Sequence, residues 1–216
     1  MKKIIFTFLF VLTLANVSAQ KYTVSGQNNG HDYVDLGLSV KWATCNIGAS
    51  SPEDYGNYFA WGEITIKDVY TKDNSITSRK KKFSENVNVG GNPKYDAAAA
   101  NWGGSWRLPT YEELEELFEK CTWKWTEKNG VKGCRVTGPN GNSIFLPAAG
   151  DFQKTMIHEA ESYGYYWSSR PSSDYRSYDS AYEISFSSSW EGRGIASKSI
   201  YMDFRENGKT IRPVTE

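Results

Sequence analysis

One short segment constrains the fold of this chain more than any other. It runs from 102 to 118 and reads Trp-Gly-Gly-Ser-Trp-Arg-Leu-Pro-Thr, then Tyr-Glu-Glu-Leu-Glu-Glu-Leu-Phe. Pro109 blocks a helix before it, Thr110 is a capping residue, and Glu113 completes a Thr-x-x-Glu capping box. The segment therefore predicts a helix that starts near Tyr111. Its buried stripe, at helical spacing, would comprise Leu114, Leu117, Phe118 and Cys121.

The same helix carries four glutamates in its first turns. Acidic side chains suit the positive end of the helix dipole. We interpret them as a solvated face rather than a catalytic carboxylate pair. They are Glu112, Glu113, Glu115 and Glu116.

After this helix the apolar pattern changes to period two, which indicates strands. Segments 122–126 and 131–137 flank Asn129-Gly130, a hairpin signal because both residues tolerate positive φ. The apolar end of the chain, 209–214, predicts a strand beside Tyr33–Trp42. A short helix is expected at 96–100 and a long polar loop at 64–95. Further strands are expected near 143–147, 163–169, 181–187 and 200–204.

These elements predict an α+β fold. We expect one domain at 32–216, with mostly antiparallel strands, one or two helices, and paired N- and C-terminal strands. Residues 20–31 are polar and rich in Gly and Asn, so we expect a flexible lead-in there. Five tryptophans in motif-like settings are expected in the core: Trp42, Trp61, Trp102, Trp106 and Trp167.

The N-terminus has the pattern of a signal peptide at 1–19. Lys2 and Lys3 precede an apolar run at 4–14, and small residues at 17–19 suit cleavage before Gln20. An uncleaved anchor is the alternative, but the run is short for a bilayer. The sequence thus predicts a protein that is secreted, periplasmic or on the cell surface, with no integral membrane segment after cleavage.

The charge balance argues against a polyanionic partner. The chain has 25 Lys and Arg against 25 Asp and Glu, so no global field draws it to nucleic acid. Its one dense basic run, 79–82, lies among Ser, Thr and Asn, and we interpret it as a solvated loop.

Three cysteines in an oxidising compartment predict one disulfide and one free thiol. The connectivity does not follow from the sequence. We favour Cys45–Cys121, because Cys134 occupies an ordinary strand position.

The chain shows no pattern that indicates catalysis. His31 and His158 are its two histidines, and we interpret both as surface residues. There is no Gly-x-Ser-x-Gly elbow, phosphate loop or His-Glu-x-x-His motif. We therefore expect no enzyme activity, no cofactor and no metal.

Seven motifs follow one another along the chain. They are Tyr-Val-Asp-Leu-Gly-Leu from Tyr33, Lys-Trp-Ala-Thr-Cys-Asn-Ile-Gly-Ala from Lys41, Tyr-Phe-Ala-Trp-Gly-Glu from Tyr58, Trp-Arg-Leu-Pro-Thr from Trp106, Ile-Phe-Leu-Pro-Ala-Ala-Gly from Ile144, Tyr-Trp-Ser-Ser from Tyr166 and Ile-Arg-Pro-Val from Ile211. In this order they resemble the Fibrobacter succinogenes major paralogous domain, which is abundant in secreted proteins of gut Bacteroidetes. The resemblance covers roughly residues 31–214.

This resemblance implies a C-type-lectin-like fold with a loop-rich ligand face. It does not imply calcium-dependent sugar binding, because the Glu-Pro-Asn or Gln-Pro-Asp triplet and the Trp-Asn-Asp motif of calcium-binding lectins are absent. Formylglycine-generating enzymes also have a lectin-like fold, but their copper-binding cysteine pair has no recognisable counterpart in Cys121 and Cys134.

Two segments, 168–180 and 187–199, are rich in Tyr, Ser, Arg and Gly, as binding loops often are. Plain polar turns, and loops diversified by a retroelement, are the alternatives. We expect a ligand-binding module for a glycan or a protein; the rivals are a polysaccharide-acting enzyme and a structural pilus or surface subunit. The expected contact residues are Tyr175, Arg176, Tyr178, Trp190 and Arg193.

Overall fold

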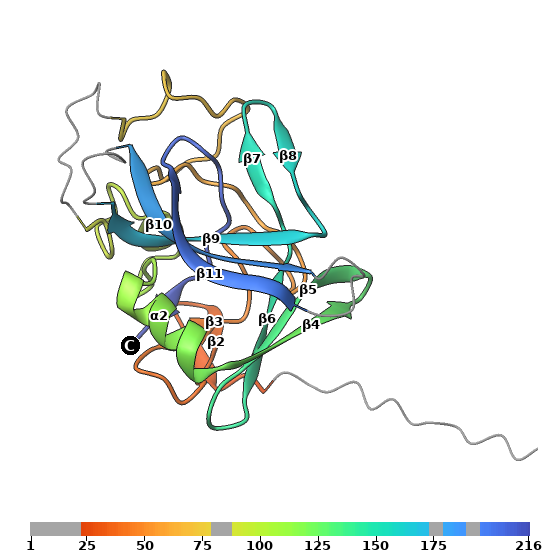
Figure 1. The fold of residues 1–216 in the computed structure, drawn as a ribbon. Helices are drawn as coiled ribbons and strands as arrows, with labels where there is room; N and C mark the ends of the chain where they lie inside the picture. Colours follow the sequence, from red (N-terminus) through yellow and green to blue (C-terminus); the bar gives the residue numbers. More distant parts are fainter. Residues whose placement is uncertain (1–22, 79–87, 173–178, 189–194) are drawn as a thin grey trace, which may run out of the picture.

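The computed structural model describes residues 23–78, 88–172, 179–188 and 195–216. Within these ranges the chain is built mainly of antiparallel β-sheets with two helices, which confirms the expected α+β class (Figure 1). The expected signal peptide and the basic run at 79–82 lie outside the described residues.

The first sheet joins the two ends of the domain. Its strands are β1 (Gly26–Asn28), β2 (His31–Val34), β3 (Lys41–Ala43) and β12 (Val214–Thr215), in that order. Val214 pairs with Trp42 and Thr215 with Lys41. The expected pairing of the N- and C-terminal strands is confirmed.

The first strand replaces part of the expected flexible lead-in. Residues 26–28 pair with 31–33, and Asn29 and Gly30 form the connecting turn with φ of 46° and 84°. Positive φ at both positions fits a two-residue hairpin turn. The expectation of a flexible 20–31 was wrong for residues 26–31, because this Asn-Gly turn and the pairing with β2 order the backbone.

The second sheet is a meander of long strands. β9 (Tyr163–Pro171), β10 (Ser180–Ser188) and β11 (Ile195–Phe204) pair antiparallel, with β10 in the middle. Two smaller sheets accompany it. One contains β4 (Thr122–Lys128), β5 (Val131–Thr137) and β6 (Ser143–Pro147), and the other contains β7 (Asp151–Gln153) and β8 (Met156–His158).

The expected hairpin between β4 and β5 is confirmed, with Asn129 and Gly130 at φ of 49° and 83°. β7 and β8 were not predicted. They are three residues each and joined through Lys154 at a φ of 55°. Short strands leave too little sequence for a periodicity to be visible.

Both helices start at side-chain caps. α2 (Tyr111–Lys120) has the expected capping box: Thr110 Oγ1 accepts from the Glu113 N–H at 3.1 Å, and Glu113 Oε2 accepts from the Thr110 N–H at 2.8 Å. The Arg107 guanidinium donates to both Glu113 carboxylate oxygens at 2.6 and 2.8 Å. The Glu113 carboxylate therefore completes the cap of α2 and, through Arg107, also holds the segment that precedes the helix.

α1 (Ala97–Trp102) is capped by a buried carboxylate. Asp96 accepts from the N–H groups of Ala98 and Ala99 through one oxygen and from those of Gly91 and Leu108 through the other. Asp96 thus fixes the short helix to the segment around Leu108 that leads to α2.

The core is aromatic, as expected. All five predicted tryptophans are buried. Trp42 lies in a cluster with Leu114, Leu117 and the inner residues of β10, and the other four lie in a second cluster with Phe59 and Ile211. A third, smaller cluster contains Tyr58, Ala60, Tyr70 and Ala149.

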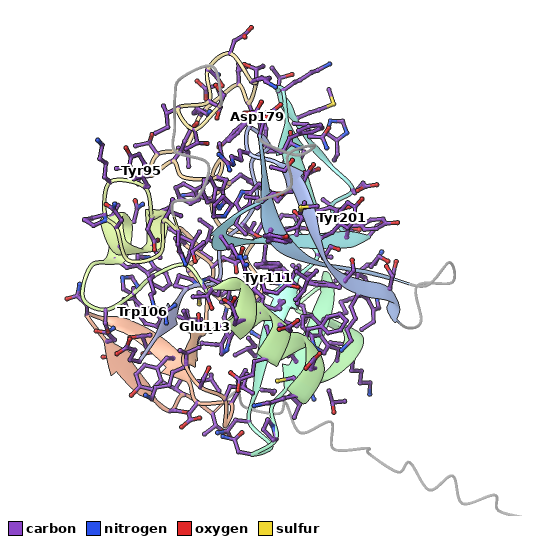
Figure 2. The ribbon with its side chains drawn as sticks, turned by 60° about the vertical axis from the view of Figure 1, so that its left-hand side comes forward. Tyr95, Trp106, Tyr111, Glu113, Asp179 and Tyr201 are labelled. Atoms are coloured by element: carbon purple, nitrogen blue, oxygen red, sulfur yellow. The ribbon has the colours of Figure 1, made fainter. Side chains whose placement is uncertain are left out.

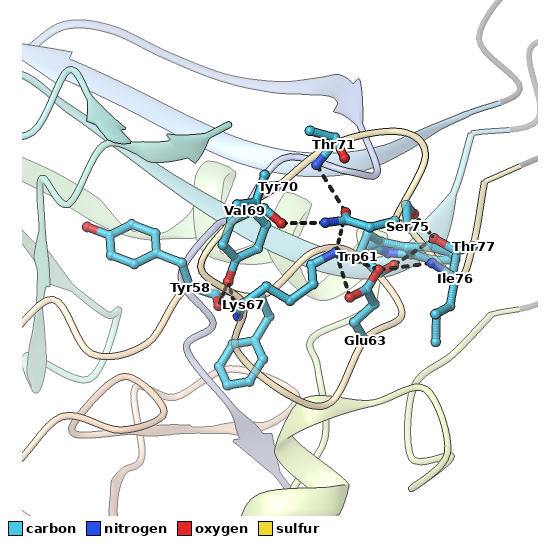
Figure 3. Close-up of polar contacts among 12 residues, drawn as sticks. Tyr58, Trp61, Glu63, Lys67, Val69, Tyr70, Thr71, Ser75, Ile76 and Thr77 are labelled. Carbon is cyan, nitrogen blue, oxygen red and sulfur yellow. Dashed lines mark hydrogen bonds and ion pairs between the residues drawn. The ribbon is translucent and has the colours of Figure 1, made fainter. Parts of the chain in front are cut away.

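The long loop is ordered around one ammonium group. Lys67 Nζ donates to Glu63 Oε1 at 3.0 Å and to Asn74 Oδ1 at 3.1 Å, and the Ile76 N–H donates to the same Glu63 oxygen (Figure 3). Asn74 also accepts from the Thr71 N–H at 3.1 Å. Five polar groups at separate points of residues 63–76 are thereby joined by hydrogen bonds.

A buried arginine connects distant parts of the fold. Arg212 is 1% exposed. Its guanidinium donates to Asn46 Oδ1 at 2.8 Å and to the carbonyls of Ala43, Thr44 and Phe145 at 2.7 to 3.1 Å. These acceptors come from the end of β3, the following turn and β6. One side chain therefore joins the first sheet to the β4–β5–β6 sheet.

We predict that Arg212→Met lowers the free energy of unfolding by about 3 kcal/mol or more, because it leaves buried acceptors without a donor. Urea unfolding followed by tryptophan fluorescence measures the change. Arg170→Met is the matched control: Arg170 forms an ion pair with Glu112 whose side chains are 45% and 65% exposed, and such pairs contribute under about 1 kcal/mol. Equal losses in the two variants would contradict the role of Arg212.

The favoured Cys45–Cys121 disulfide is not present: all three cysteines are free thiols. Cys121 and Cys134 lie in the core cluster that contains Trp42, whereas Cys45 follows β3 outside that cluster. Cys121 is a core residue at the end of the apolar stripe of α2, as the helical spacing predicts, and that position separates it from Cys45.

Native protein should therefore react with iodoacetamide at Cys45 alone. Burial raises the pKa of the Cys121 thiol to about 11 and that of Cys134 to about 12, so both remain protonated and unreactive at pH 8. Mass spectrometry should count one label per native chain and three after denaturation. A label on Cys121 before unfolding, or any native label on Cys45→Ser, would contradict this assignment.

Candidate ligand-binding face

The five expected contact residues lie in segments 173–178 and 189–194, outside the described residues. The strands that lead into these segments are described. The first segment connects β9 to β10 and the second connects β10 to β11. Nine residues of β10 separate the two connections, which corresponds to about 30 Å. The two groups of residues therefore start from opposite ends of one sheet.

The described surface between those ends is one face of the β9–β10–β11 sheet. In register across this face lie Ser185 opposite Tyr165 and Ser199, and Ser187 opposite Tyr163 and Ser197. Two residues before Ser185 on β10, Glu183 lies opposite Tyr201 of β11. We call the outer part of this surface the Tyr–Ser face: Tyr163, Tyr165, Ser185, Ser187, Ser197, Ser199 and Tyr201.

Aromatic rings and hydroxyl groups lie side by side on the Tyr–Ser face, with the stacked rings on β9 and the serine pairs on β10 and β11. The Oγ atoms of Ser185 and Ser199 are 2.9 Å apart, and those of Ser187 and Ser197 are 3.0 Å apart. The rings of Tyr163 and Tyr165 stack at 5.7 Å between centroids, with 4° between their planes. The result is a row of paired hydroxyls beside two parallel rings.

Part of this face is open to solvent. Tyr201 is 67% exposed and Tyr163 is 36% exposed, and Ser197 and Ser199 are exposed. Figure 2 labels Tyr201 on β11, to the right of Tyr111 on α2. An exposed tyrosine combines a large apolar ring with a hydroxyl, which suits it to ligand contact.

The opposite face of the same sheet is covered. Ile184 and Phe186 of β10 lie in the core cluster with Leu114 and Leu117 of α2, and Ile200 packs against that cluster. Alternation along the strands explains the division, since successive side chains point to opposite faces.

A buried ionic cluster lies next to the Tyr–Ser face. Lys209 Nζ is 2.8 Å from a Glu183 carboxylate oxygen, 2.7 Å from one of Asp203 and 3.6 Å from one of Asp151. The ammonium also lies 4.4 Å from the ring centroid of Tyr165 and 5.1 Å from that of Trp167. Lys209 therefore holds the centre of β10 and the end of β11 through charge.

One ammonium facing three carboxylates leaves an excess of negative charge in a buried place. Burial raises the pKa of Glu183 to about 7, against the opposing effect of Lys209. Burial also disfavours the charged form of Lys209, but Glu183, Asp203 and Asp151 outweigh it and raise the pKa of the lysine. The lysine thus stays charged while Glu183 changes its protonation near neutral pH.

The described part of the Tyr–Ser face carries no exposed basic side chain. Lys198 of β11 is directed to the other side, where its Nζ donates to the Phe118 carbonyl at 2.5 Å. Arg170 of β9 lies over the rings of Tyr111 and Tyr182 and forms an ion pair with Glu112. Tyr165 OH donates to Glu159 at 2.5 Å. The local charge is neutral to negative, which disfavours an anionic ligand.

The two histidines occupy separate places. His158 is exposed at the end of β8, whereas His31 is half-buried and stacks on Trp102. In the described ranges no three His, Cys, Asp or Glu side chains are grouped in a way that could hold a metal ion. The longest described helix, α2, has ten mostly polar residues, and no helix in the described part of the chain could cross a membrane.

Comparisons with protein-family models, with curated proteins and with solved structures found no match.

The sequence interpretation placed the contacts in the connecting segments and overlooked the strands between them. Tyr163, Tyr165 and Tyr201 read as ordinary strand aromatics. A partial signal was nevertheless present, because serine recurs at every second position in 185–187 and 197–199, and such spacing puts each pair of hydroxyls on one face of its strand.

We predict that Lys209→Met destabilises the protein by about 3–5 kcal/mol, because three buried or partly buried carboxylates lose their cation. Glu183→Gln should cost much less, since Asp203 still neutralises Lys209. Urea unfolding at pH 7 compares the two variants. A larger loss in Glu183→Gln than in Lys209→Met would contradict the assignment.

Glu183→Gln should also change the dependence of stability on pH. The pKa of Glu183 is higher in the folded chain than in the unfolded one, so its stabilising contribution is complete below about pH 4.5 and is lost as pH rises through about 7. Unfolding curves of the wild type and Glu183→Gln across this range should therefore differ in slope. Parallel curves would contradict the raised pKa.

Proposed function

We propose that this protein is a secreted, non-enzymatic module that binds a neutral glycan through the Tyr–Ser face. The observation that carries the proposal is the row of stacked tyrosines and paired serine hydroxyls on one face of the β9–β10–β11 sheet, whose outer members Tyr163, Ser197, Ser199 and Tyr201 are exposed. Aromatic rings stack on the apolar faces of sugar rings, and serine hydroxyls both donate and accept hydrogen bonds.

The charge of the face favours a neutral glycan over an acidic one. Within the described residues it presents hydroxyl groups, with the Glu159 carboxylate beside them, and no exposed ammonium or guanidinium group. A sulfated or uronic-acid polymer would bring negative charge to this surface without a counter-ion. A neutral polysaccharide needs only hydroxyl partners and stacking rings.

The resemblance to the Fibrobacter succinogenes major paralogous domain supports this proposal. We infer a C-type-lectin-like architecture from the motif series, and the pairing of β3 with β12 agrees with it. The signal-peptide pattern at 1–19 supports a place outside the cytoplasm, either in the periplasm, secreted or on the cell surface. A glycan at the cell exterior is a ligand that such a protein would meet.

Tyr201→Ala should weaken glycan binding about tenfold, corresponding to about 1.4 kcal/mol, because an exposed aromatic contact is lost. Native gels cast with laminarin, hydroxyethyl cellulose, mannan or xylan measure the affinity as retardation of the band. Phe204→Ala is the matched control: Phe204 is a 56% exposed aromatic residue on the same strand, three positions further on and on the opposite face.

The proposal requires that at least one neutral polysaccharide retards the wild type and that Phe204→Ala behaves like it. It is contradicted if no polysaccharide retards the wild type while a protein ligand is captured. It is equally contradicted if Phe204→Ala loses as much affinity as Tyr201→Ala.

A further inference from the structure

A pocket of about 210 Å³ opens beside the turn between β1 and β2. Strand ends from the first sheet form one wall, and the turn after β3 and the end of α1 close it. None of its residues belongs to the Tyr–Ser face. The residues that line it include Gln27, His31, Asp32, Cys45, Ser50 and Trp102.

An aromatic pair forms a rigid wall of this pocket. The His31 ring stacks on Trp102 at 3.9 Å between centroids, with 8° between their planes. Trp106 contacts Trp102 edge-on at 5.2 Å, and its indole N–H donates to the Asn28 carbonyl at 2.8 Å. Asn29 donates to the Trp102 carbonyl. Trp102 and Trp106 are thus both hydrogen-bonded to residues at the β1–β2 turn.

Polar groups of fixed position form the other walls. Asp32 Oδ1 accepts from Gln27 Nε2 at 2.6 Å. The Thr44 N–H donates to the Asp32 carbonyl at 3.0 Å, and the Thr44 carbonyl accepts from Arg212 at 2.7 Å. Continuing the register of β2 and β3 by two residues places Cys45 opposite His31. The pocket is therefore built on the same framework that Arg212 stabilises.

The charge of the pocket excludes anions. It is lined by one carboxylate, Asp32, and by no Lys or Arg. Burial lowers the pKa of His31 against the raising effect of Asp32, so the imidazole is neutral at pH 7. Acceptor groups are in excess, and the ligand must supply hydrogen-bond donors.

A cation fits less well than a neutral donor. Strong cation–π binding needs an open indole face, but His31 covers one face of Trp102 and the residue is only 9% exposed. The half-buried His31 lines the pocket in front of Trp102, and one Asp32 oxygen is already bonded to Gln27. The volume corresponds to about seven water molecules, which is small for a drug-sized compound and suits a single hydroxylated ring.

We propose that this pocket binds one neutral sugar residue, with the His31 ring against the apolar face of the sugar and Asp32 and Gln27 bonded to its hydroxyls. The site is separate from the Tyr–Ser face, and the two proposals do not depend on each other.

The rate of Cys45 alkylation tests this proposal, because the thiol lies in the pocket wall. Full-length native protein is treated with iodoacetamide in the presence of glucose, galactose, mannose or N-acetylglucosamine, and labelled Cys45 is counted by mass spectrometry. At least one sugar should slow the reaction saturably. At about ten times its dissociation constant the rate should fall roughly tenfold, since only the free fraction reacts.

Two variants separate binding from a general effect of the sugar. Ser50→Trp places a large side chain in the pocket from an exposed position and should remove the protection. Ser51→Trp makes the same change one residue away, outside the pocket lining, and should retain it. Tyr201→Ala should also retain it, which keeps this test distinct from that of the sheet face.

The proposal is overturned if none of the four sugars slows the reaction. It is also overturned if choline protects Cys45 as strongly as the best sugar, or if Ser50→Trp and Ser51→Trp respond alike.

Discussion

The buried guanidinium of Arg212 is the interaction on which the rest of this structure depends. It bonds to the carbonyls of Ala43 and Thr44, to the side chain of Asn46 and to the Phe145 carbonyl. Two residues later the chain enters β12 and pairs with β3. One side chain therefore supports three features of the fold. They are the pairing of the two ends of the domain, the attachment of the β4–β5–β6 sheet and the wall of the pocket beside Cys45.

The last segment of the chain supplies two more buried cations. Lys209 binds the Glu183 and Asp203 carboxylates beside the Tyr–Ser face, and Arg205 donates to the Ser180 carbonyl while its guanidinium lies 4.7 Å from the Trp61 ring. Buried charges of this kind are costly unless they are paired. Lys209 is paired through ionic contacts, and Arg205 through a carbonyl and an aromatic ring, so both cations hold one end of the sheet, away from the exposed Tyr163 and Ser197.

Local signals predicted much of the fold. The capping box at Thr110 and Glu113 and the Asn129-Gly130 turn each act within a few residues, so they are visible in the sequence. The ionic cluster was not predictable in this way, because Asp151, Glu183 and Lys209 are far apart in the chain and meet only through the sheet. The open surface was overlooked for the same reason: whether Tyr163 or Tyr201 faces solvent depends on which side α2 covers.

The extent of the Tyr–Ser face has a consequence for the size of what it could hold. On β11 its members run from Ser197 to Tyr201, and four residue steps along an antiparallel strand correspond to about 14 Å. Beyond Ser185 and Tyr165 the next side chains on the same side of the sheet, Glu183 and Trp167, are buried. The exposed strip is therefore short, and any ligand that extends past it has to leave the sheet and make its further contacts elsewhere.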